Sequence, residues 1–263
     1  MQANSATSAA RNPANPMISV IGLYKSFGEN EVLRGIDLEI GRGESLMLVG
    51  GSGAGKSVFI KHLIGLLQPD DGNVVVDGVD LTRASPEAVL ELRKRFGMTF
   101  QEGALFDSMT VGDNIAFPIR RHTEKSEKEV ERRVRECLEL VRLPGIEDKM
   151  PSELSGGMRR RVGFARAIAL EPEILLFDEP TTGLDPINTA AIGTVINQLR
   201  TELEVTAVTI THDMGLATRI ADRVAILRRG QILLIDTPDR FLESDHWFVR
   251  AFLNGEVPEE DHP

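Results

Sequence analysis

Cysteine is almost absent from this chain of 263 residues, in which Cys137 stands alone. A single cysteine excludes an intramolecular disulfide and a zinc site built from cysteines, and it is typical of a reducing compartment. Apolar residues recur at helical spacing around it, namely Val130, Val134, Leu138 and Val141. The pattern predicts a small core residue on a helix, the alternative being a nucleophilic thiol.

Long hydrophobic runs are missing too. The apolar stretches ILLF and ILLI fall far short of the roughly 20 residues that span a bilayer as a helix. The first sixteen residues, MQANSATSAARNPANP, have no apolar core, so we expect a disordered tail over 1–16 and not a signal peptide. The chain alone is therefore expected to be soluble, and a transport path would have to belong to another polypeptide.

Positive charge is in deficit, with 30 Lys and Arg against 40 Asp and Glu and a net charge of -10 at pH 7. An acidic chain repels nucleic-acid backbones unless its basic residues gather on one face, so nucleic acid is a poor candidate partner. The same charge can serve solubility alone. Hydrophobic residues at 41% and charged residues at 27% predict an ordinary globular protein with a sizeable core.

Hairpin signals lie near both ends of the chain. MISVIGLYKSFGENEVLRGIDLEI predicts short strands around the turn GEN, and the alternation in GIDLEI predicts a half-buried antiparallel sheet. NVVVDGVDL predicts a hairpin with its turn at Asp77-Gly78, and RVAILRRGQILLID another about Arg229-Gly230.

The middle of the chain has the pattern of a parallel sheet with crossover helices. ESLMLVG, EILLFDEP and VTAVTITHD are near-continuous apolar runs, as expected for strands covered on both faces. Helices are predicted over VFIKHLIGLLQ, stopped by Pro69 and Gly72, and over PINTAAIGTVINQLRTE. Residues 103 to about 160 are predicted to be mainly helical.

A glycine-rich loop lies between the first of these strands and its helix. It reads Gly50-Gly51-Ser52-Gly53-Ala54-Gly55-Lys56-Ser57 and fits G-x-x-x-x-G-K-[ST] in full. Small residues let backbone N–H groups approach a β-phosphate, Lys56 neutralises β- and γ-oxygens, and the Ser57 hydroxyl ligates Mg²⁺. Because a strand precedes it and a helix follows, we prefer a phosphate loop to a merely flexible one.

Polar side chains follow the other apolar strands. Asp178 and Glu179 come at the end of ILLFDEP, where open α/β sheets place their ligands. Neighbouring residues at a strand end point different ways, so Asp178 can hold Mg²⁺ while Glu179 polarises water. His212 can reach a γ-phosphate, and Gln101 suits Mg²⁺ or the attacking water, although a histidine at a strand end is also a common cap or surface residue.

A second glycine pair opens a predicted helix in ELSGGMRRRVGFARAIAL, residues 153–170. Free N–H groups and the helix dipole make Ser155, Gly156 and Gly157 a second anion cradle, but one without a lysine. Ser155 also suits the N-cap position. The three arginines 159–161 spread around the helix, so at least one is expected on a solvated face.

With these residues in order, the chain resembles the ATP-binding subunits of ABC transporters over almost its whole length. The matching motifs are the phosphate loop at 50–57, the Q-loop glutamine Gln101, the signature LSGGM at 154–158, ILLFD with Glu179 as Walker B segment and catalytic base, the D-loop GLD with Asp185, and the switch histidine His212. Met158 departs from the commoner glutamine and leaves Ser-Gly-Gly intact. Tyr24 occupies the place of the aromatic residue that stacks on adenine; a core position is the alternative.

The resemblance implies an α/β fold, a P-loop NTPase of ABC type. It has a mixed sheet core, an N-terminal antiparallel β subdomain and an inserted helical subdomain at about 103–160. The ATPase domain would span 17–245, followed by a C-terminal extension over 246–263. Implied cofactors are ATP and Mg²⁺. Two copies would meet head to tail, so that ATP on one phosphate loop is closed over by residues 155–157 of the other copy.

The amino-acid sequences of these motifs look most like those of the Mla/Mce-type ATPases, which traffic phospholipids between bacterial membranes. That resemblance implies an integral-membrane permease, a lipid-binding Mce-domain protein and, in many systems, a small STAS-domain subunit. It also implies a place on the cytoplasmic face of the inner membrane, peripheral through the permease. Rival hypotheses are the ATPase of an importer for small polar solutes such as amino acids, and a nucleic-acid-linked ABC ATPase, which the acidic charge disfavours.

Two apolar segments leave alternatives open. GALFDSMTVGDNIAFPIR carries Leu105, Phe106, Met109, Ile115 and Phe117. These residues would form either the core of the helical subdomain or, as the resemblance implies, the groove that receives a coupling helix of the permease. In the C-terminal extension, the aromatic residues Trp247, Phe248 and Phe252 would pack either on a partner copy or on their own subunit.

Overall fold

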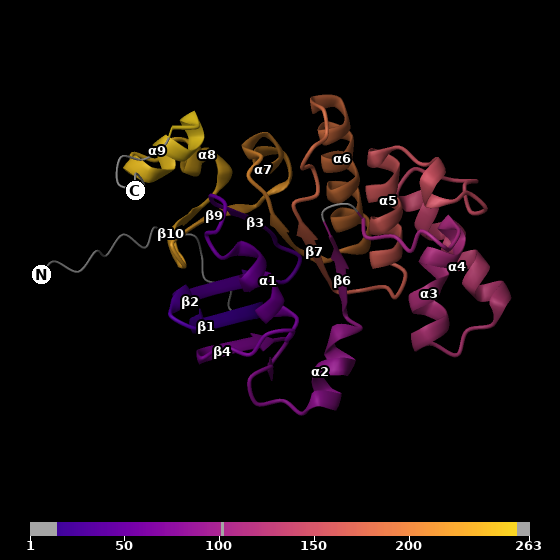
Figure 1. The fold of residues 1–263 in the computed structure, drawn as a ribbon, viewed down its shortest axis with the longest axis horizontal. Helices are drawn as coiled ribbons and strands as arrows, with labels where there is room; N and C mark the ends of the chain where they lie inside the picture. Colours follow the sequence, from indigo (N-terminus) through magenta and orange to yellow (C-terminus); the bar gives the residue numbers. More distant parts are fainter. Residues whose placement is uncertain (1–14, 101–102, 257–263) are drawn as a thin grey trace, which may run out of the picture. The chain divides into compact units, whose positions relative to one another are not determined.

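The computed structural model describes residues 15–100 and 103–256, which fold into two compact units. The first unit contains residues 15–41, 46–82 and 212–256, and the second contains 42–45 and 83–211 without 101–102. Figure 1 follows the chain through both units by colour.

The first unit contains an antiparallel sheet in the order β2-β1-β4-β5. Its strands are β1 (Pro16–Phe27), β2 (Asn30–Gly41), β4 (Asp71–Val76) and β5 (Val79–Asp80). Along β2, Ile36, Leu38 and Ile40 are buried while Asp37 is exposed, which confirms the predicted alternation. Asp77 and Gly78 both have positive φ, 47° and 79°, as a tight hairpin turn requires.

A mixed sheet completes the first unit. β3 (Ser45–Val49) pairs in parallel with β9 (Arg223–Arg228), which pairs antiparallel with β10 (Gln231–Asp236). α1 (Lys56–Leu63) follows β3. The prediction that Pro69 and Gly72 stop this helix is wrong, because α1 ends at Leu63, just before Gly65 at φ 64°. Glycine adopts that left-handed conformation at low cost and so ends helices readily.

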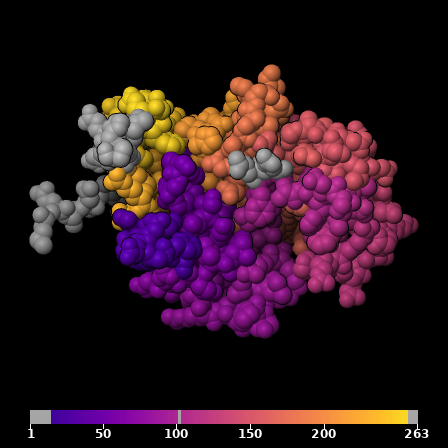
Figure 2. Space-filling model, in the orientation of Figure 1, coloured from indigo at the N-terminus to yellow at the C-terminus, as the bar shows by residue number. Residues whose placement is uncertain are grey.

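The unit also contains three C-terminal helices, α7 (Met214–Ile220), α8 (Pro238–Leu242) and α9 (Trp247–Asn254). In Figure 2 the yellow residues of α9 lie at the surface. Phe248 is buried and faces the Arg228 guanidinium, 4.3 Å from its ring centre, while Trp247 is exposed and 4.7 Å from the same group. These aromatic residues were expected to pack either on a partner copy or on their own subunit, and Phe248 packs on its own subunit.

The second unit contains a parallel sheet in the order β8-β7-β6. These strands are β6 (Phe96–Thr99), β7 (Ile174–Asp178) and β8 (Thr206–Ile210), and α6 (Pro186–Leu203) is the crossover from β7 to β8. Every residue of β8, and every residue of β7 except Asp178, is buried, as their apolar sequences predict.

Helices make up most of the rest of the second unit. They are α2 (Pro86–Arg93), α3 (Val111–His122), α4 (Glu127–Leu140), the short 3₁₀ helix η1 (Pro151–Glu153) and α5 (Gly156–Ala167). α3, α4 and α5 pack against one another (Figure 1). Cys137 is fully buried on α4, and burial raises the pKa of its thiol to about 11, so it is a core residue as predicted.

Candidate functional site

The phosphate loop connects β3 to α1 and is shaped by two close backbone approaches. At Gly55, which caps α1 at φ 106°, a Cβ atom would lie 2.8 Å from Leu33 Cδ2. At Gly50 a Cβ atom would overlap the carbonyl oxygen of Leu227. Any side chain at either position would push the loop away from the strands beneath it, so both glycines are required by the packing.

Lys56 lies folded over this loop. Its Nζ donates hydrogen bonds to the carbonyl oxygens of Gly50, at 2.8 Å, and Gly51, at 3.0 Å. Ser57, in the first turn of α1, is exposed. A lysine ammonium and a helix N-terminus at the same loop form a strong site for an anion.

Tyr24 projects from β1 and is 47% exposed, so the core alternative for this residue is wrong. Register shifts in the pairing of β1 with β2 flank Leu23 and Tyr24, and such irregularities turn a side chain out of the simple alternation. The ring lies over Gly35 of β2, where a Cβ would be 2.7 Å from the tyrosine oxygen. Stacking of Tyr24 on adenine stays a prediction.

The two carboxylates of the Walker B segment differ in backbone and partners. Asp178 is the last residue of β7 and is half-buried. Glu179 has a left-handed φ of 49°, its N–H donates to the carbonyl of Ile210 at 2.9 Å, and its Oε2 accepts a hydrogen bond from Thr182 Oγ1 at 3.1 Å. A left-handed non-glycine residue is costly and is often found at functional sites. Sequence reasoning missed Thr182, although it lies between two matched motifs.

Asp185 caps the N-terminus of α6. Its Oδ1 accepts hydrogen bonds from the backbone N–H groups of Ile187 and Asn188, both at 3.0 Å. These hydrogen bonds, first among them the one from the Asn188 backbone, lower the pKa of the carboxyl group, so Asp185 is an anion at neutral pH.

The second glycine pair opens α5 as predicted. Ser155 is its N-cap, with the Met158 N–H donating to Ser155 Oγ at 3.3 Å, so the capping role is present. Ser155 and Gly156 are exposed, whereas Gly157 is buried. The side-chain oxygen of Asn188 lies 3.4 Å from where a Cβ of Gly157 would be, which places the start of α5 against the start of α6.

Two further predicted residues follow strands. His212 is exposed and comes two residues after β8. Gln101 lies outside the described residues. Their roles toward the γ-phosphate and Mg²⁺ stay predictions.

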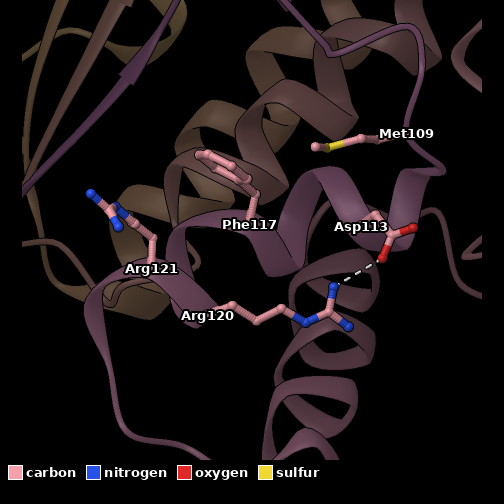
Figure 3. A pocket seen from close by; sticks show the side chains of 5 residues that line it. All are labelled: Met109, Asp113, Phe117, Arg120 and Arg121. Atoms are coloured by element: carbon pink, nitrogen blue, oxygen red, sulfur yellow. Dashed lines mark hydrogen bonds and ion pairs between the residues drawn. The ribbon is translucent and has the colours of Figure 1, made fainter.

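The apolar segment GALFDSMTVGDNIAFPIR, residues 103–120, is divided between core and surface. Ile115 is fully buried in α3, but Phe106 and Phe117 are exposed, with ring centres 5.2 Å apart. Phe117 and Met109 line a pocket with Asp113, Arg120 and Arg121 (Figure 3). Ile115 thus belongs to the core, whereas Phe106 and Phe117 do not; a groove for a coupling helix of the permease stays a prediction.

The two arginines of this pocket differ in their partners. Arg120 pairs with Asp113 at 3.0 Å and with Glu127 at 2.8 Å. The hydrogen bonds that its guanidinium donates to these carboxylates, Glu127 first, raise the pKa of Arg120. Figure 3 shows the Arg121 guanidinium pointing away from Asp113 and Arg120, and Arg121 is exposed. The pocket thus has an apolar floor and one cation whose charge is not balanced by the Asp113 and Glu127 carboxylates.

Comparison with known proteins places the chain in a family. The profile of the family described as "ABC transporter" matches residues 33–182. The probable ribonucleotide transport ATP-binding protein mkl of Mycobacterium leprae is 44% identical over 93% of this chain and 71% of its own. The intermembrane phospholipid transport system ATP-binding protein MlaF of Haemophilus influenzae is 40% identical over 91% of each chain. The methionine import ATP-binding protein MetN of Carboxydothermus hydrogenoformans is 44% identical over 86% of this chain and 68% of its own.

A solved structure agrees with these relatives. A dimeric ATP-binding cassette in a post-hydrolysis state, bound to ADP and Pi, is 29% identical to this chain, with a TM-score of 0.77 over 84% of this chain and 99% of that one. The α/β fold predicted from the motifs, a P-loop ATPase of ABC type with a mixed sheet and an antiparallel sheet, is confirmed.

Proposed function

We propose a phospholipid-transport function from one premise: the chain belongs to the ABC transporter family and is an ATPase. The observation that carries the choice of lipid is the 40% identity to the phospholipid-transport ATPase of Haemophilus influenzae, which extends over 91% of both chains. In this proposal ATP hydrolysis by the chain powers the movement of phospholipid across or between bacterial envelope membranes, through a separate permease.

The first unit supplies the residues that would hold ATP. Backbone N–H groups between Gly50 and Ser57 would surround the β-phosphate, and Lys56 would exchange the carbonyl oxygens of Gly50 and Gly51 for β- and γ-oxygens. The exposed ring of Tyr24, supported from below by Gly35, is available to stack on adenine.

The donor set suits Mg²⁺. Ser57, Gln101 and Asp178 offer a hydroxyl, an amide and a carboxylate oxygen, the hard ligands that Mg²⁺ prefers. Residues 15–100 and 103–256 contain no cluster of three His, Cys, Asp or Glu side chains that could hold a metal ion. The three oxygen donors would hold the ion, and a bound Mg²⁺ would supply positive charge against the β- and γ-phosphates.

Hydrolysis would then depend on the chain's own base. Glu179, aligned by the Thr182 hydroxyl, would polarise the attacking water, and His212 would contact the γ-phosphate and respond to its loss. Asp178 would stay with the metal, because its place at the end of β7 differs from the left-handed turn of Glu179.

The signature segment supports a head-to-tail homodimer. Ser155 and Gly156 are exposed at the N-terminus of α5, which has the N–H groups of an anion site but no lysine. Residues 155–157 would close over ATP held by Lys56 of a second copy, and Asp185 would lie at the same interface. The dimeric cassette among the related structures is consistent with this arrangement.

The pocket of α3 would receive the permease. A short helix of that subunit can lay apolar side chains on Phe117 and Met109 and an acidic one against Arg121. No helix in 15–100 or 103–256 is long and apolar enough to span a bilayer. Binding through this pocket would hold the chain on the cytoplasmic face of the inner membrane. A lipid-binding Mce-domain protein and a small STAS-domain subunit would complete the complex.

The lipid proposal is tested by purifying the chain with its membrane subunit and identifying the bound ligand by mass spectrometry. We expect phospholipid in the complex, and faster ATP hydrolysis when the complex is reconstituted with added phospholipid acceptor vesicles. The second candidate function is import of a small polar solute, which the 44% identity to a methionine importer favours. An amino acid in place of lipid, with hydrolysis stimulated by that amino acid, would establish this second function.

A further inference from the structure

Three consecutive arginines, 159–161, begin the second turn of α5, and the structure gives each a different anchor. Arg159 Nε donates to the carbonyl oxygen of Pro151 at 2.9 Å, and Arg161 Nη1 to that of Arg142 at 3.3 Å. Pro151 lies in η1, and Arg142 lies just after α4. Arg160 points elsewhere: it is 8% exposed, and its Nη2 donates to the carbonyl oxygen of Thr182.

The acceptor, Thr182, belongs to the turn that follows Glu179. Its own N–H donates to the Glu179 carbonyl at 3.4 Å, and its Oγ1 donates to Glu179 Oε2 at 3.1 Å. The turn continues with the Leu184 N–H donating to the Thr181 carbonyl at 3.1 Å. Arg160 therefore holds the main chain of the residue whose side chain aligns the Glu179 carboxylate.

The same helix carries the signature residues at its start. Ser155 caps α5 five positions before Arg160, and Gly157 lies against Asn188, whose N–H binds Asp185. A rigid helix transmits a displacement of its N-terminus to the guanidinium one turn later. Because the Arg160 side chain is buried and its hydrogen bond to Thr182 is charge-assisted, that displacement would reach the Thr182 turn.

We infer that Arg160 is a positioning residue that couples the signature helix to the orientation of the Glu179 carboxylate. This inference rests on the proposed role of Glu179 as the base. Contact of Ser155 with ATP on a second copy would set the position of α5, and Arg160 would pass that position to the base of its own copy. Each ATP site would thus respond to occupancy of the other.

Steady-state ATP hydrolysis by the full chain tests the inference with R160A, R160K and the matched control R161A. We expect R160A to lower kcat by about tenfold or more with KM for ATP changed by less than about twofold, since a misaligned Glu179 weakens transition-state stabilisation but leaves the ATP contacts in place. R160K, which keeps a cationic donor, should recover most of that rate. R161A should reduce thermal stability while kcat stays near the wild-type value.

Thr182 provides a second set of variants. T182A removes the hydroxyl but keeps the carbonyl that Arg160 binds, while T182S keeps both. If the two residues act in sequence, R160A/T182A should be no slower than the slower single variant. A wild-type kcat in folded R160A, a rise in KM alone, or multiplied effects in the double variant would overturn the inference. E179Q, assayed beside them, separates the cases: if E179Q hydrolyses ATP, the base assignment has failed and not the Arg160 link alone.

Discussion

At the scale of single residues, Glu179 offers the sharpest test of the chemistry. Glutamine has nearly the same shape, tolerates the same left-handed backbone about as well, and can still accept a hydrogen bond from Thr182. E179Q should therefore keep ATP binding and lose turnover by about a hundredfold or more, because only the water-polarising carboxylate is removed. Single-turnover hydrolysis and nucleotide titration measure the two effects separately. Hydrolysis at a near-normal rate would mean that another group is the base.

Lys56 should act on binding itself. The Lys56 ammonium binds two carbonyl oxygens, and with ATP it would bind phosphate oxygens in their place. K56A removes this ammonium. A charge-assisted contact is worth roughly 1.5–3 kcal/mol, so we expect ATP affinity to fall by roughly ten- to a hundredfold. K61A is the matched control, since Lys61 is an exposed lysine of the same helix. Equal losses in both variants would point to general electrostatics and not to the phosphate loop.

At the scale of helices and strands, the elements that the sequence predicts best are those with one unambiguous pattern. β3, β7 and β8 are near-continuous apolar runs, a pattern that predicts buried strands, and almost all of their residues are buried. The hairpins were predictable because Gly78 and Gly230 suit positive φ, and both adopt it together with the residues before them, Asp77 and Arg229.

Other features depend on interactions that no local pattern records. The outward turn of Tyr24 results from register shifts between β1 and β2, which alternate residues do not reveal. α2 escaped prediction even though a local signal exists, with Pro86 in its first turn and Ser85 Oγ accepting from the Ala88 N–H at 3.2 Å. The carbonyl oxygens that anchor Arg159, Arg160 and Arg161 lie 8, 22 and 19 residues away, so only the folded structure separates these three neighbours.

Helix α4 should show a pH dependence that comes from Cys137. Burial raises the pKa of its thiol from 9.0 to about 11, so the folded state favours the neutral thiol. Its contribution to the free energy of unfolding is present below pH 9 and is lost as the pH rises toward 11, because the unfolded thiol ionises first. Urea unfolding of wild type and C137A between pH 7 and pH 11 measures it. The stability difference should shrink only on the alkaline side; a constant difference would contradict the shift.

At the scale of the whole molecule, the pocket of α3 should decide attachment to the permease. R121E replaces the cation at the pocket edge by an anion that would repel an acidic partner helix, while Arg120 keeps its pairs with Asp113 and Glu127. We expect the variant to lose co-purification with the membrane subunit but to bind ATP normally. R132E, a charge reversal at a 71% exposed side chain of α4, is the control. If R121E and R132E lost co-purification equally, the pocket of α3 would not be the attachment site for the permease.

The shared ATP site is a property of two molecules, and mixing variants can reveal it. K56A removes the phosphate-loop charge and S155R blocks the signature cradle, so each variant alone should form dimers with two defective sites. In a head-to-tail heterodimer of the two, both defects fall in one site and the other site is intact. Random mixing makes half the dimers mixed, so activity should return to about a quarter of the wild-type value if the intact site works alone. The double variant K56A/S155R, mixed with itself, should stay inactive. An S155R protein that hydrolyses ATP at the wild-type rate would refute the shared site directly, because an arginine side chain cannot fit where Ser155 must meet a γ-phosphate.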